Sequence, residues 1–162
     1  MALDAFMKID GIAGEAKDSD HKEWIEITGY SFGNTQPTTL TATSAGGATS
    51  GRTQLADFHV SKRLDFASVK LFGESCAGKH IKEVTIAVHR AGGEKLKYFE
   101  IVLEEVIISS YTQIAQDGIP LESIQFNYGR IKTTYTQQRR SDGGEAGNVA
   151  AGWDQIANKQ YA

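Results

Sequence analysis

Several features that whole classes of protein depend on are scarce or missing in this sequence. Its 162 residues include a single cysteine, Cys76, so no internal disulfide can form and folding in a reducing compartment is expected. Residues 1–8 contain neither a basic segment nor an unbroken apolar stretch, so no secretory signal is predicted. Apolar runs such as 101–103 and 106–108 are far shorter than the roughly 20 residues that a membrane span needs. We therefore expect a soluble protein without a membrane partner.

An excess of positive charge is also lacking. The chain has 17 Lys and Arg residues against 20 Asp and Glu residues, which gives a net charge of −3. Surfaces that compete for nucleic-acid phosphates usually carry the opposite sign. The short basic run of Lys132, Arg139 and Arg140, near Tyr128 and Tyr135, is therefore interpreted as a salt-bridged surface or a subunit contact. We expect no nucleic-acid partner.

Alternating apolar and polar residues predict a mainly β protein with long strands. Residues 81–90 and 95–110 are typical of two strands around a hairpin at Gly92 and Gly93, because glycine adopts the positive φ that tight turns need. A first short strand is expected to end near Ile9 or Ile12, and three further strands are expected at 22–34, 54–63 and 124–138.

The apolar side changes partway along two of these strands. The change falls near Gly29 in the second strand and near Glu105 in the hairpin, and it predicts a bend or bulge at each place. Residues 141–151 are small and polar and are interpreted as a loop.

One short helix is predicted after Asp65, which is a plausible N-cap. Val69, Phe72 and Cys76 recur at spacings of three and four, and Gly78 stands where a left-handed C-cap would be. In this interpretation Cys76 is a buried core residue.

A loop without apolar period occupies residues 35–53 and is rich in threonine and glycine. Loops of this length are uncommon in compact domains and are usually functional or disordered. It is a candidate interaction arm.

Three matches to catalytic or ligand motifs lack the structural context that their chemistry requires. Ser31 lies in a G-x-S-x-G pattern, but no helix is predicted after it, so a polar strand position is favoured over a nucleophile. Residues 46–53 resemble a phosphate-binding loop but lead into a strand instead of a helix. Cys76 and His80 have the spacing of two metal ligands, yet Gly78 is expected to break the helix between them. We predict no catalytic residue, no metal site and no cofactor.

Taken together, the motifs resemble the haemolysin-coregulated protein (Hcp) family, the tail-tube subunit of bacterial type VI secretion. The matching stretches, in the family's order and spread over nearly the whole chain, are 4–9, 14–15 with Asp18, 31–33, 75–80, 90–94, 105–110 and 152–154. The loop at 36–52 and residues 136–140 depart from the family pattern.

The resemblance implies a single domain over residues 1–162, with two packed antiparallel β-sheets forming a barrel, one flanking helix and an extended loop. It also implies a non-enzymatic tube subunit in which six copies close into a ring and rings stack inside a contractile sheath. Secreted effectors would occupy the lumen, and a spike protein would sit at the tube tip. The protein would be made in the bacterial cytoplasm and exported by type VI secretion without a signal peptide.

Site residues follow from the same resemblance. Contacts between stacked rings are expected from one loop, at Thr41, Ser44, Gly46, Gly47 and Arg52. Ser31 is a candidate for the lumen surface. Two alternatives remain open: a serine hydrolase that uses Ser31, and a monomeric β-barrel that binds a small ligand.

Overall fold

Two long antiparallel strands organise the fold. The structure, a computed structural model, describes residues 3–38, 50–90, 96–142 and 144–162. Within that part of the chain the strands are β1 (Asp4–Ile9), β2 (Ile25–Ile27), β3 (Gly29–Ser31), β4 (Asn34–Thr35), β5 (Gln54–Leu55), β6 (Phe58–Arg63), β7 (His80–His89), β8 (Lys97–Ile114), β9 (Leu121–Gln138), β10 (Glu145–Asp154) and β11 (Lys159–Gln160). One helix, α1 (Ser68–Ala77), lies between β6 and β7.

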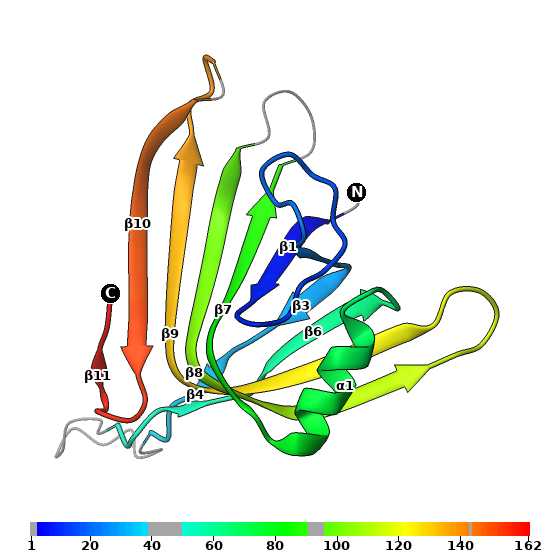
Figure 1. The fold of residues 1–162 in the computed structure, drawn as a ribbon. Coiled ribbons are helices and arrows are strands. Elements are labelled where there is room, and N and C mark those ends of the chain that lie inside the picture. Colours follow the sequence, from blue (N-terminus) through cyan, green and yellow to red (C-terminus); the bar gives the residue numbers. More distant parts are fainter. Residues whose placement is uncertain (1–2, 39–49, 91–95, 143) are drawn as a thin grey trace, which may run out of the picture.

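The hairpin of β8 and β9 belongs to both layers of the fold. In one layer the strand order is β11-β10-β9-β8-β7-β1-β2, and in the other β9 pairs with β6, which pairs with β3. Figure 1 shows β8 and β9 bending from the upright layer into the layer that lies beside α1. Residues 121–126 of β9 pair with β6, whereas residues 130–138 pair with β10.

The bend occurs where the sequence predicted a change of apolar side. Glu105 has a left-handed backbone with a φ of 54°, and the buried positions shift there from Leu103 to Val106. A Cβ at the facing Gly129 would lie 3.0 Å from Glu105 Oε2 and 2.7 Å from a carbon of Ile156, so the ends of both side chains would have to move if another residue replaced this glycine. The residue that the pairing skips is Ser109, so the register shift lies four residues beyond the predicted place.

The predicted strand at 22–34 is interrupted next to its predicted bend at Gly29. Thr28 separates β2 from β3 and donates its backbone N–H to the Ser61 carbonyl at 2.8 Å. The strand pairing therefore runs from β2 through β1, β7, β8, β9 and β6 to β3, and the chain itself joins β3 back to β2 through Thr28. This confirms the predicted mainly β fold of packed antiparallel layers with one helix.

The core fills the space between the layers. Burial of each large apolar side chain contributes roughly 1.5–3 kcal/mol relative to exposure, so this cluster is the main stabilising feature of the fold. Its fully buried members include Met7, Ile25, Phe58, Val60, Leu71, Ile86, Ile101, Leu103, Ile124 and Phe126.

Helix α1 is confirmed, but its predicted buried face is wrong. Gly78 is the left-handed C-cap with a φ of 63°, and its N–H bonds to the Glu74 and Ser75 carbonyls. The N-cap is Ala67 rather than Asp65, although the Asp65 carboxylate accepts the Ala67 N–H at 3.0 Å.

The buried side chains of α1 are Ser68 and Leu71, whereas Val69, Phe72 and Cys76 are exposed. The prediction of a buried Cys76 is therefore wrong. Ser68 is polar, yet it faces the interior, where its hydroxyl donates a hydrogen bond to the Glu122 carboxylate. No helix in the described ranges has the length and apolar character to cross a bilayer.

The prediction of a loop at residues 141–151 is also wrong, because most of this segment is strand β10. Its Ala, Gly and Asn residues have low intrinsic strand propensity. Pairing with the second half of β9, from Glu145 opposite Gln138 to Asp154 opposite Arg130, holds the segment extended.

Candidate subunit-contact surfaces

A row of apolar residues crosses the upright layer on the side that faces the core. The row continues past the part of this side that the second layer covers. The row runs through paired neighbours in the order Ile27, Ala5, Val88, Phe99, Tyr135 and Val149. Directly paired residues of antiparallel strands point to the same face. Exposure nevertheless rises along the row, from 4% at Ile27 to 39% at Tyr135 and 65% at Val149. The second layer therefore leaves part of this face uncovered, and we call Tyr135, Val149 and Ala151 the overhang.

Strand β10 also presents an open edge. β11 pairs only with Trp153 and Asp154, and the Gly152 carbonyl accepts the Tyr161 N–H, so residues 145–151 have no strand on their outer side within the described parts of the chain. Residues 145–151 are all exposed. An unpaired edge next to an uncovered apolar face is suited to pairing with another chain.

A second apolar surface lies at the opposite end of the molecule, around α1 and the tip of the β8–β9 hairpin (Figure 1). Val69 on α1 is 80% exposed, and the Phe72 ring lies against the Tyr111 ring of β8 at an angle of 54°, with ring centroids 5.8 Å apart. The other large exposed apolar residues of this surface are Leu64, Phe66, Ile114, Ile119 and Leu121. Several exposed apolar side chains on neighbouring elements are typical of an interaction site.

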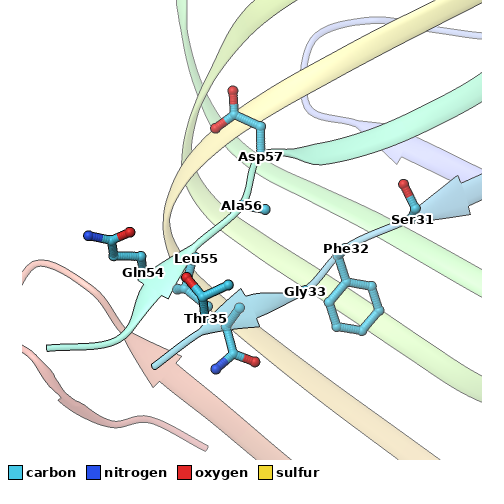
Figure 2. A pocket seen from close by; sticks show the side chains of 9 residues that line it. Ser31, Phe32, Gly33, Thr35, Gln54, Leu55, Ala56 and Asp57 are labelled. Atoms are coloured by element: carbon cyan, nitrogen blue, oxygen red, sulfur yellow. The ribbon is translucent and has the colours of Figure 1, made fainter. Parts of the chain in front are cut away.

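The base of the long loop is an ordered two-stranded ribbon. Asn34 pairs with Leu55 in β4 and β5, and the Asn34 side-chain amide donates to Thr53 Oγ1 at 3.1 Å. Beside the ribbon lies an open depression of about 530 Å³. Figure 2 shows that Ser31 and Phe32 point to different sides at its rim.

The family model described as "Type VI secretion system effector, Hcp" matches residues 6–135. The chain belongs to the Hcp family. It is 30% identical to Protein hcp1 of Pseudomonas aeruginosa over 163 residues, which covers 99% of each chain.

Solved structures of Hcp proteins have the same fold. A structure described as a type six secretion system protein superposes with a TM-score of 0.92 at 29% identity, covering 99% of this chain and 100% of the other. Hcp1 from Salmonella typhimurium superposes with a TM-score of 0.81 at 27% identity, with the same coverage. The resemblance found in the sequence is therefore confirmed, and the chain is a protein of type VI secretion.

Ser31, the predicted lumen residue of this Hcp chain, is exposed at the end of β3. Its pairing neighbour is His59, but the His59 ring lies against Ser123, with Nε2 and Oγ 2.5 Å apart. The segment after Ser31 continues into β4 instead of a helix. The arrangement lacks the strand-to-helix turn and the adjacent base that a serine nucleophile needs.

Of the five predicted ring-stacking residues, only Arg52 lies in the described part of the chain. Its guanidinium donates a hydrogen bond to the carbonyl of Gln155, which joins the loop base to the turn after β10. The other four, Thr41, Ser44, Gly46 and Gly47, lie outside the described residues.

Two further motif matches lie in the part of the chain that the structure describes. α1 ends at Ala77 and His80 begins β7, and the described residues contain no group of three or more His, Cys, Asp or Glu side chains that suits a metal ion. In the basic run, Arg139 pairs with Asp142 at 3.1 Å, as a salt-bridged surface would.

A buried ionic network that sequence reasoning missed joins α1 to the barrel. Lys62 Nζ is fully buried and donates to Glu122 Oε1 at 2.6 Å, Asp65 Oδ1 at 2.8 Å and Ser68 Oγ at 3.0 Å. Burial acts to raise the pKa of the Glu122 carboxyl, but hydrogen bonds from Lys62, Ser68 and Tyr111 outweigh burial and lower the pKa. Burial and the Glu122 hydrogen bond raise the pKa of Tyr111 to about 12, so the phenol stays protonated. Each buried charge therefore has its partners, and the network has a structural role.

Proposed function

We propose that this Hcp-family chain, as one domain, is a non-enzymatic tube subunit that closes into hexameric rings and stacks them into a conduit for secreted effectors. The observation that carries the proposal is the combination of the overhang and the open edge of β10. The number six comes from the family resemblance. The contractile sheath, the spike protein and export from the cytoplasm belong to the same proposal.

Ring closure follows from where the two apolar surfaces lie. The overhang is on β9 and β10, and the second surface is on α1 and the hairpin tip at the far end of the molecule. Because these surfaces differ, contact between them would be head-to-tail, and head-to-tail contacts close into a ring when the rotation divides a full turn. A second copy beside β10 would also supply hydrogen-bond partners for residues 145–151.

Stacking and cargo contacts are proposed from the loop and from Ser31. Thr41, Ser44, Gly46, Gly47 and Arg52 would contact the next ring, and the ribbon of β4 and β5 would fix where this loop leaves the barrel. The exposed Ser31 would face the lumen. Sheath contraction would supply the free energy for transport, since no bond has to be made or broken.

The experiment that tests this function is size-exclusion chromatography with light scattering, followed by particle imaging. We expect a single species of six times the 17.6 kDa chain mass and annular particles. A monomer at every concentration into the micromolar range would contradict the ring and favour the ligand-binding barrel. An esterase activity that Ser31→Ala abolishes would instead support the hydrolase.

A further inference from the structure

Two buried histidines meet where the segment of residues 13–24 folds onto the barrel. His21 lies in that segment and His89 lies at the end of β7, and each is 6% exposed. Their Nε2 atoms are 3.1 Å apart, and His21 Nδ1 is 2.9 Å from Asp18 Oδ2. Neither residue belongs to the surfaces assigned to ring contacts.

The hydrogen bonds among Asp18, His21 and His89 indicate which ring nitrogens carry protons. The Asp18 carboxylate accepts, so His21 carries its proton on Nδ1 and its Nε2 is an acceptor. His89 must then donate from Nε2, which leaves His89 Nδ1 without a proton. That nitrogen is buried and has no hydrogen-bond partner in the described residues.

Aromatic packing holds the pair in a dry environment. The His21 ring stacks on Phe6 of β1 with centroids 4.8 Å apart and an interplanar angle of 3°, and Trp24 meets it edge-on at 4.7 Å. Phe6 is itself 4% exposed. Water therefore cannot readily solvate a charge on His89 while the segment is in place.

The charged groups around His89 oppose one another. Asp4 on β1 and Asp18 favour its protonated form, whereas His21 and Lys97 on β8 disfavour it. Burial is the largest effect, followed by His21, and together they lower the pKa of His89 below its ordinary value of 6.5.

The 13–24 segment relies on this packing because its backbone mainly bonds to itself. Glu23 donates to the Ala16 carbonyl at 2.9 Å and Gly14 donates to the Glu23 carbonyl at 2.7 Å. A further link to the rest of the fold is Glu15, whose carboxylate accepts the Phe66 N–H at 3.2 Å just before α1. Loss of the histidine contact would therefore loosen the segment as a unit and, through Glu15, the approach to α1.

We propose that the His21–His89 pair is a pH-sensitive contact that holds residues 13–24 on the barrel at neutral pH and releases them on acidification. The added proton binds His89 Nδ1, which creates a buried imidazolium whose new N–H has no acceptor. Opening the segment brings water to that group. In the closed form, with residues 13–24 on the barrel, the pKa of His89 is lowered, so this form binds fewer protons than the open form. The stability of the closed form therefore falls as the pH drops below the ordinary His89 pKa of 6.5, which applies in the open form. It levels off once the pH is below the lowered pKa of His89 in the closed form.

Hydrogen exchange measured by mass spectrometry tests the proposal on the assembled protein. After correction for chemical exchange rates, we expect protection of a peptide covering 13–24 to fall below pH 6.5 with a slope approaching tenfold per pH unit, as for uptake of one proton. His89→Gln should remove this dependence. His80→Gln should keep it, because His80 is exposed at the other end of the same strand.

The pKa of each histidine can be measured separately from the pH dependence of imidazole C2-hydrogen exchange in the unaltered protein. We expect His89 to titrate below 6.5 together with the loss of protection. Protection that does not change between pH 7.5 and 5, a slope that persists in His89→Gln, or titration of His89 at or above 6.5 would overturn the proposal. None of these readouts depends on ring formation, so a monomeric protein would contradict the proposed function and leave this test intact.

Discussion

At the scale of single residues, Lys62 carries a buried charge that needs hydrogen-bond and ion-pair partners inside the fold. Its ammonium is fully buried but touches the carboxylates of Glu122 and Asp65 and the Ser68 hydroxyl. Removing one partner from a buried ion pair leaves an uncompensated charge and typically costs about 3–5 kcal/mol. We therefore expect Lys62→Met to lower the free energy of unfolding by about that amount, measured by urea titration at a fixed protein concentration.

The matched control is Lys82→Met, an exposed lysine on β7. It should change the free energy of unfolding by no more than about 0.5 kcal/mol, as surface substitutions usually do. The double variant Lys62→Met with Glu122→Leu should recover part of the loss, because both charges then leave the interior. Equal stability of Lys62→Met and Lys82→Met would contradict the structural role of the network.

At the scale of the element, α1 and its C-cap include two glycines with opposite roles. Gly78 ends the helix with a φ of 63°, whereas Gly73 lies inside the helix with nothing within 4 Å of an added Cβ. Gly78→Ala should destabilise by roughly 1–2 kcal/mol because a Cβ disfavours the left-handed backbone. Gly73→Ala should stabilise by roughly 0.5–1 kcal/mol because alanine favours the helix interior.

Urea unfolding of both variants under identical conditions measures the two effects. Each substitution adds one methyl group to the same helix, so they are controls for one another. The opposite signs are the decisive result. Two changes of the same sign would mean that the C-cap does not determine how α1 ends.

The elements that could be predicted from the sequence are those whose pattern is local. Gly78 marked the end of α1, and the changes of apolar side at Gly29 and Glu105 marked where strands leave one layer for the other. The buried face of α1 was not predictable in this way, since Ser68 faces inward only because Glu122, far away in the sequence, accepts its hydrogen bond.

Strand β10 had no local signal at all. Small residues at 145–152 lack apolar alternation, and their strand conformation depends on the register with β9. The overhang could not be predicted from the sequence for the same reason. It depends on the pairing of Tyr135 with Val149 in a part of the sheet that the second layer does not cover. The candidate contact surface is thus a tertiary feature, whereas the family could be predicted from ordered short motifs.

At the scale of the whole molecule, the second layer of β3 and β6 covers one part of the upright layer, while β10 lies beyond β9 at the other end of the strand order. A monomer with this shape would leave an apolar face and a strand edge in water, two features that folded proteins usually protect. Covering both with one neighbouring copy removes both exposures at once. The same surface therefore provides the sharpest test of assembly.

Val149→Glu places a charge in the centre of the overhang. Val149 is 65% exposed in the single chain, so the folded subunit should keep its stability within about 0.5 kcal/mol. In a ring the carboxylate would be buried without a partner, so the mass measured by light scattering should fall from that of the ring toward 17.6 kDa. Ala13→Glu adds the same charge at an exposed position outside both apolar surfaces and should leave the ring intact. Rings of unchanged mass and stability in Val149→Glu would show that the overhang is not the subunit contact.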